Sequence, residues 1–273
     1  MNAGFWKKIR AMVSVAASIV VAPMAAGAEK TVESVAEETA WSEVAETRST
    51  YYRQAFGDLP PRNRLRLVNL LGVWDDSALY SIEATRLGRN VWAYSTFGLS
   101  NADMPAKVGI PDPDAVLDDL GRVTGSGATQ PRRPREPAQA HEGAAGYGYE
   151  LLVLARQDAA WPLHVLHWAV SAEVFHDIGL LARVESAHAI TVRDISVGPG
   201  PRDKVCLLIA PPLPPLPAGT QLPNGRMQIL VATVITPEEM AWSRRHGAPA
   251  LLARLVSAGI GQYSDRDRPS VLI

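Results

Sequence analysis

The stretch GYGYELLVL, residues 146–154, is apolar at both its odd and its even positions. Successive side chains of a β-strand point to opposite faces of the sheet, so both faces of this segment need cover. The pattern predicts a central strand from Tyr147 to Arg156 with packing on both sides. The glycines at 146 and 148 are expected to ease a bend where the chain enters the sheet. The side chains on one face are Tyr147, Tyr149, Leu151 and Val153, and those on the other are Leu152 and Leu154.

Further strands and helices are predicted on both sides of this strand. Gly88 and Asn90 tolerate positive φ, which favours a hairpin between residues 79–85 and 91–97. Thr236-Pro237 is typical of a helix start. The other predicted strands are 65–74, 205–210 and 227–235, and the other predicted helices are 33–56, 161–175 and 249–257. The prolines between 211 and 217 indicate a stiff, extended connector.

Four separated segments carry a further pattern. They are NVWAYSTFGLS (residues 90–100), GYGYELLVL (146–154), WPLHVLHWAV (161–170) and LPNGRMQILVATVITPEE (222–239). In this order they resemble the suppressor of fused domain family, including its bacterial members. The resemblance implies an α+β fold, with a mostly antiparallel or mixed sheet packed by helices, and a single lobe of the two found in animal members.

The resemblance also implies a function. Animal members hold a transcription factor and clamp an extended peptide between two lobes, and some bacterial members are thought to neutralise toxins. The expected role is therefore non-enzymatic binding of a protein or an extended peptide, either in general or as an immunity-like antidote. An extended segment docking along a sheet edge would be held by backbone hydrogen bonds. A hydrolase or metal-dependent enzyme with an unrecognised site is the alternative.

Five residues form the predicted partner-binding set. Asp103 stands where the family pattern expects a peptide-gripping tyrosine, and Glu142 lies near an expected aspartate. The missing tyrosine ring argues against transcription-factor binding of the animal kind. Trp92, Tyr94 and Tyr147 complete the set, because aromatic residues concentrate at binding surfaces. Aromatic residues in strands are nevertheless more often part of a core.

Catalytic and metal-binding patterns are weak, and no cofactor or metal is predicted. His164 and His167 lie one helical turn apart without a companion motif for a zinc site. The segment 98–100 (GLS) lacks the second glycine of a nucleophile elbow. Adjacent carboxylates such as Glu238 and Glu239 diverge in direction and do not form an acid–base pair by themselves. This last pair is interpreted as complementing a helix dipole.

The first 28 residues have the order of a signal peptide. Three basic residues precede an uncharged stretch, 11–28, which ends in Ala26-Gly27-Ala28. We expect cleavage after Ala28 and a periplasmic or secreted protein. The apolar middle of about a dozen residues is too short for a stable membrane span. An uncleaved anchor, or a cytoplasmic protein with a mis-assigned start codon, is the alternative.

The rest of the chain, 29–273, is predicted to be one domain with a flexible proline- and glycine-rich insertion at 104–145. This insertion is either a flap over a binding surface or a solvated insertion without such a role. Cleavage of the leader changes the formal net charge from −1 to −4, so nucleic acid is an unfavourable partner. The single cysteine, Cys206, cannot form an intramolecular disulfide and is expected to be buried.

Overall fold

The computed structural model describes residues 32–59, 65–66, 78–102, 104, 143–176, 178–198, 200 and 203–272. The strands of this part are β1 (Leu65–Arg66), β2 (Ala78–Glu83), β3 (Trp92–Phe97), β4 (Ala144–Ala155), β5 (Ile190–Ser196), β6 (Lys204–Ala210), β7 (Gly219–Leu222), β8 (Gly225–Ile235) and β9 (Tyr263–Ser264). Its helices are α2 (Val32–Phe56), α3 (Trp161–His176), α4 (Leu180–Ala187), α5 (Pro237–His246) and α6 (Ala248–Ser257).

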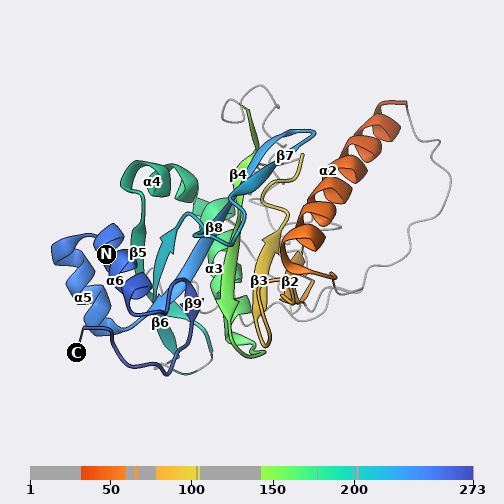
Figure 1. The fold of residues 1–273 in the computed structure, drawn as a ribbon. Helices are drawn as coiled ribbons and strands as arrows, with labels where there is room; N and C mark the ends of the chain where they lie inside the picture. Colours follow the sequence, from red (N-terminus) through yellow and green to blue (C-terminus); the bar gives the residue numbers. More distant parts are fainter. Residues whose placement is uncertain are drawn as a thin grey trace, which may run out of the picture.

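These strands form one mixed sheet in the order β1-β2-β3-β4-β8-β6-β5, with β7 beside β8 and β9 beside β4 (Figure 1). The predicted hairpin is confirmed, because β2 and β3 pair antiparallel from Ala78–Phe97 to Glu83–Trp92. The neighbours β4 and β8 run parallel, whereas β3 and β6 pair antiparallel with β4 and β8. The α+β fold with a mixed sheet is therefore confirmed.

The central position of β4 is also confirmed, since β3 and β8 flank it and all its residues after Ala144 are buried. The strand begins at Ala144, three residues before its predicted start. The last residues of the predicted insertion thus belong to the sheet, and residues 105–142 lie outside the described residues. Gly146 and Gly148 have φ angles of 56° and 81°, and the register with β8 shifts between Ala144 and Tyr149. The predicted bend is found here.

Helices cover both faces of the sheet (Figure 1). On one face, Leu151 and Val153 of β4 share a core with α3 and α4. On the other face, Leu152 packs with α2, and further along the sheet Leu208 packs with α5 and α6. The predicted helices 33–56, 161–175 and 249–257 are therefore confirmed. No helix in the described ranges is long and apolar enough to cross a membrane.

The proline-rich segment 211–217 is not the extended spacer that the sequence predicts. The backbone N–H of Leu216 donates to the Leu213 carbonyl (3.0 Å), which makes a turn, and Leu216 packs against the α2 side of the core. The Tyr51 hydroxyl of α2 donates to the Pro217 carbonyl (3.2 Å). The segment is a packed loop between β6 and β7, both of which pair with β8.

The threonine-capped helix start is confirmed. Glu239 N donates to the Thr236 hydroxyl (3.2 Å), and Thr236 N donates to the Glu239 carboxylate (3.0 Å), which forms a capping box. Glu239 does more than complement the dipole, because it is fully buried and accepts hydrogen bonds from Arg268 (2.6 Å) and Val271 N (2.9 Å). Burial raises the pKa of Glu239, but the hydrogen bonds from Arg268, Val271 and Thr236 outweigh it, so the pKa is lowered from 4.5.

Replacing Glu239 with glutamine is expected to lower the free energy of unfolding at neutral pH by about 2 kcal/mol, because Arg268 loses its buried counter-charge. The folded-state pKa is below the unfolded one. The stability from Glu239 is therefore present above the unfolded pKa and is lost as pH falls through the folded pKa. Urea unfolding between neutral and acidic pH should show a flatter acid limb for E239Q. The exposed neighbour Glu238 gives the control, and an equal loss in E238Q would contradict the assignment.

Candidate functional site

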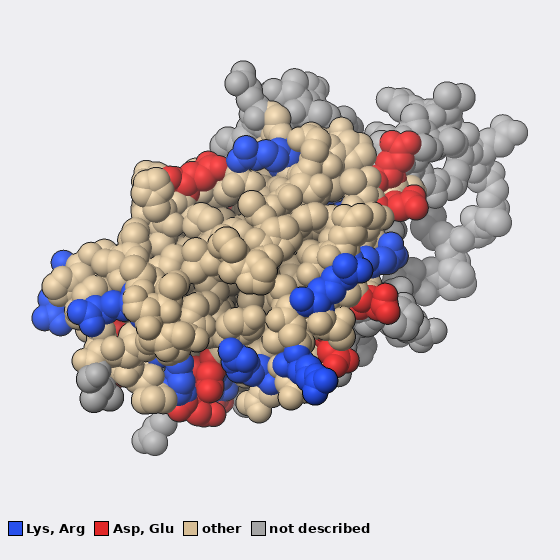
Figure 2. Space-filling view, in the orientation of Figure 1, with Lys and Arg blue, Asp and Glu red and all other residues tan. Residues whose placement is uncertain are grey.

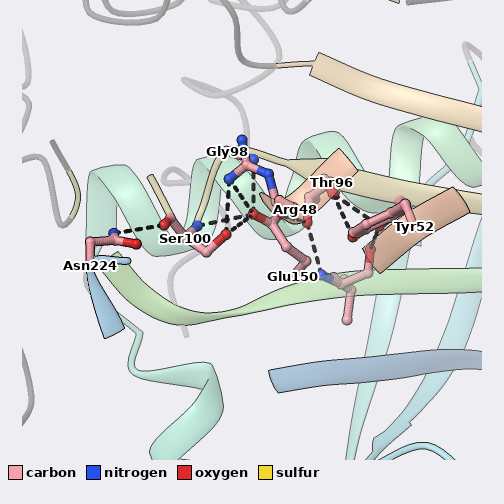
Figure 3. Close-up of polar contacts among 9 residues, drawn as sticks. Arg48, Tyr52, Thr96, Gly98, Ser100, Glu150 and Asn224 are labelled. Atoms are coloured by element: carbon pink, nitrogen blue, oxygen red, sulfur yellow. Dashed lines mark hydrogen bonds and ion pairs between the residues drawn. The ribbon is translucent and has the colours of Figure 1, made fainter. Parts of the chain in front are cut away.

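Glu150 interrupts the apolar run of β4, and its carboxylate lies fully buried at the centre of a polar network (Figure 3). Its Oε1 accepts hydrogen bonds from Gly98 N (2.9 Å), Ser100 N (3.0 Å) and the Ser100 hydroxyl (2.6 Å). Its Oε2 accepts from the Thr96 hydroxyl (2.6 Å). The carboxylate therefore holds the turn that follows β3.

Arg48 of α2 supplies the positive charge of this network. Its Nη1 lies 3.3 Å from Glu150 Oε1 and donates to the Ser100 hydroxyl (2.9 Å). The guanidinium carbon is 4.0 Å from the centre of the Phe97 ring, a cation–π contact. Both charged side chains are at most 2% exposed. Burial of two charges is tolerable only because each is paired and hydrogen-bonded.

Two further side chains tie neighbouring elements to the network (Figure 3). The Tyr52 hydroxyl of α2 lies 2.6 Å from the Ser95 hydroxyl of β3. Asn224, in the turn between β7 and β8, donates from Nδ2 to the Ser100 carbonyl (3.1 Å). The network thus joins α2, β3, β4 and the β7–β8 turn, and it brings together three of the four segments singled out in the sequence.

Backbone hydrogen bonds beside this network hold the chain on either side of residues 105–142. Tyr147 N donates to the Leu99 carbonyl (2.8 Å), and Arg226 N donates to the Gly143 carbonyl (2.6 Å). The Ser100 hydroxyl donates to the Glu150 carboxylate, and among the described residues it makes no hydrogen bond to a histidine. The arrangement suits a structural anchor and does not activate Ser100 as a nucleophile.

Tyr94, a predicted partner-binding residue, is fully buried. Its hydroxyl donates to Asp158 Oδ1 (2.9 Å) and accepts from Ala159 N (2.6 Å). Burial raises the pKa of Tyr94 to about 12, so the hydroxyl stays protonated at neutral pH. In this conformation Tyr94 fixes the loop between β4 and α3.

The other predicted residues are distributed differently. Tyr147 is buried, and Trp92 is half-buried against the α3 side of the core. Asp103 and Glu142 lie outside the described residues. Their contact with a partner stays a prediction, and among the three described members only Trp92 offers appreciable surface.

The described part of the chain holds no group of three histidine, cysteine or carboxylate side chains that could bind a metal. His164 is exposed and His167 is half-buried; burial, aided by the nearby His164, lowers the pKa of His167. Cys206 is half-buried and not fully buried as predicted, because it packs at the margin of the α5–α6 core. Burial raises the pKa of its thiol, which lowers the thiolate fraction at neutral pH.

A pocket of about 430 Å³ opens at the carboxyl end of β4, and the loop held by Tyr94 forms one wall. Two arginines, Arg156 and Arg266, and two aspartates, Asp265 and Asp267, are among its lining residues. These charges are balanced, so the pocket does not favour one class of ligand. Its other lining residues are Ala155, Gln157, Ala159, Trp161 and Ser264.

The edge strand β5 offers a different kind of surface. It pairs with β6 on one side, and no described strand pairs with its other side. Arg193 and Asp194 interrupt the register, Asp194 has a φ of 62°, and the two exposed side chains approach to 3.7 Å. A bulge and charges of this kind protect an edge from unspecific pairing. The edge strand β7 is not open in the same way as β5, because α2 packs beside it.

The exposed surface of the described residues contains one large hydrophobic side chain, Val256, which is 48% exposed. A broad apolar docking patch is therefore absent from this part of the chain. The described surface offers a partner the backbone groups of β5, charged and polar side chains, and half-buried rings such as Trp92. The β5 edge, with the helices beside it, is the candidate binding site.

The comparisons with known proteins concern the fold and the family. The family model described as Suppressor of fused protein matches residues 74–269, which include Glu150 but not Arg48. A crystal structure of a Sufu–Fu complex aligns with 14% identity and a TM-score of 0.49, over 84% of this chain and 93% of that chain. Drosophila Suppressor of Fused aligns with 16% identity and a TM-score of 0.44, over 72% of this chain and 42% of that chain.

No curated protein sequence matches the chain. The family model, in contrast, covers the sheet from β2 onward and the helices from α3 to α6. Because this match spans well over half of the sequence, the protein belongs to the suppressor of fused family, a family of protein-interaction modules.

Proposed function

We propose that this protein is a non-enzymatic module that binds a polypeptide partner outside the cytoplasm. The observation that carries the proposal is the family match over residues 74–269. The Sufu–Fu complex is an assembly of two proteins, which agrees with a binding role for relatives of this fold. The buried Arg48–Glu150 network makes the sheet a rigid platform, which reduces the entropy lost on binding.

The proposed site is the outer edge of β5. An extended segment laid along this edge would pair with its free backbone groups, and its alternate side chains would reach the helices beside the sheet. Such docking needs no broad apolar patch, in agreement with the exposed surface of the described residues. The bulge at Asp194 would restrict which segments fit.

The proposed compartment rests on the leader, residues 1–28, which lies outside the described residues. Cleavage after Ala28 would release a mildly acidic chain into the periplasm or the medium. More specifically, the partner would be a toxin that this chain neutralises, as is thought for some bacterial members of the family. A secreted-toxin gene beside the gene for this chain would support that version.

The proposal predicts that the protein is recovered outside the cytoplasm and there captures a defined polypeptide. Cell fractionation followed by intact mass measurement should show loss of residues 1–28. Chemical cross-linking and affinity capture from the same fraction should return one reproducible polypeptide, absent when the chain is denatured before capture. A broad hydrolase screen and metal analysis test the alternative that the protein is an enzyme. Turnover of a substrate, or a bound ion without any captured polypeptide, would overturn the proposal.

A further inference from the structure

We infer that the segment bound by this protein is acidic, and that its carboxylates are held by a cluster of arginines at the ends of α5 and α6. This inference deepens the proposed function and rests on it. We call the cluster the arginine corner; it consists of Arg244, Arg245 and Arg254, with His246 beside them. All four side chains are exposed.

The arginine corner is positively charged, whereas the chain as a whole has a small negative net charge. The whole sequence has a formal net charge of −1, yet the run from Met240 to Ser264 contains three arginines and no aspartate or glutamate. Figure 2 shows Lys and Arg side chains gathered at the end of the molecule where Figure 1 places α5 and α6. A concentrated positive potential of this kind attracts an acidic partner.

Trp242 organises part of the corner. Its ring stacks on His246 with centroids 4.2 Å apart and an interplanar angle of 23°. The guanidinium carbon of Arg254 lies 4.8 Å from the centre of the same ring. The aromatic ring thereby holds a cation of α6 against α5, so the side chain is ordered before a partner arrives.

A simpler role of these cations is to complement the negative ends of the two helix dipoles, because they lie in the last turns of α5 and α6. One cation at each end would serve that role. The last turn of α5 carries Arg244, Arg245 and His246 together. The excess at the last turn of α5, opposite the acidic first turn with Glu238 and Glu239, points to a partner with negative charge.

The corner lies beside the candidate docking edge. Both α5 and α6 pack against β5, and the Ser243 hydroxyl of α5 lies 3.5 Å from the Thr191 hydroxyl of β5. A segment paired with β5 would direct every second side chain toward the face that these helices cover. A polypeptide with acidic residues at alternate positions would therefore place carboxylates near the corner, where arginine can bind them in bidentate geometry.

An anionic membrane is a less suitable occupant. Interfacial binding needs an apolar face that enters the lipid, and Val256 is the one large hydrophobic side chain exposed in the described part of the chain. The Trp242 ring is already engaged with His246 and Arg254. The geometry favours carboxylates of a polypeptide over lipid headgroups.

The test measures fluorescence anisotropy of a fluorescein-labelled, alternating Glu-Val peptide of about twelve residues, long enough to cover the edge. The full chain should bind this peptide in preference to its Lys-Val and Ser-Val counterparts, and binding should weaken with added salt. Combining R244E with R245E should weaken it by about tenfold, because two attractions become repulsions. R244Q with R245Q should give a smaller loss while preserving helix-forming side chains.

The matched control is R86E with R89E, which makes the same charge change at two exposed arginines in the turn between β2 and β3. It should leave peptide affinity unchanged. Equal losses in both double variants, or no preference for the Glu-Val peptide, would overturn the inference. Binding to phosphatidylglycerol vesicles but not to the Glu-Val peptide would also overturn it and would assign the corner to a membrane. If the arginine variants still capture the natural partner at full yield, this inference fails while the proposed function stands.

Discussion

Replacing Arg48 with methionine is expected to lower the free energy of unfolding by about 3–5 kcal/mol, because Glu150 would keep its buried charge without a counter-ion. Methionine fills much of the same volume, so a cavity contributes little to the loss. The contact of the guanidinium with the Phe97 ring is removed as well. Urea unfolding followed by circular dichroism measures the effect.

The matched control is R53M, which removes an exposed arginine from the same helix. Its effect should stay within about 0.5 kcal/mol. Adding E150Q to the R48M variant should recover part of the loss, because the neutral amide keeps one acceptor oxygen for Gly98 N and Ser100 N and removes the unpaired charge. Equal stability of R48M and R53M would show that the network does not anchor α2.

Replacing Gly146 with alanine is expected to cost about 3 kcal/mol, through positive φ and steric overlap together. The residue has a φ of 56°, and an added Cβ would lie 2.4 Å from the Leu99 carbonyl oxygen and 2.8 Å from Met104 Cβ. The turn that Glu150 holds would have to move. Thermal and urea unfolding of the variant should both report the loss.

Gly143 supplies the control for this effect. Its φ is also positive, at 73°, but an added Cβ meets no atom of the described residues within 4 Å. G143A should therefore cost only the backbone strain, about 1 kcal/mol. If the two alanine variants were equally stable, close packing of β4 against the preceding turn would be ruled out as the reason for Gly146.

Local patterns in the sequence predict the elements whose cause is local. The two apolar faces of β4 follow from residues 146–154, and the start of α5 follows from the cap at Thr236. The strand β5 escapes prediction because Arg193 and Asp194 break its apolar pattern at a bulge. The short β7 and β9 exist only through their pairing with β8 and β4, which no local pattern reveals.

The polar network illustrates the same limit. Glu150 is visible in the sequence as a charge within an apolar strand, which already calls for a buried partner. Its partner Arg48 lies far away in the sequence, on a helix with other charged residues, and nothing local distinguishes it. The aromatic residues predicted as partner contacts show a second limit. Aromatic residues are common at interfaces, but the fold buries Tyr94 and Tyr147.

The arginine corner could be found in the sequence as a run that lacks acidic residues, 240–264. Its position beside an open strand edge could not be found in the sequence, because only the sheet order brings β5 and α5 together.

The most direct test of polypeptide binding at the β5 edge is photo-cross-linking from that edge. A benzoylphenylalanine at position 196, in place of the exposed Ser196 of β5, should form a covalent adduct with the captured polypeptide. The same group in place of the exposed Glu83 of β2, toward the other side of the sheet, should form none. Adducts from position 83 but not from position 196 would contradict the account.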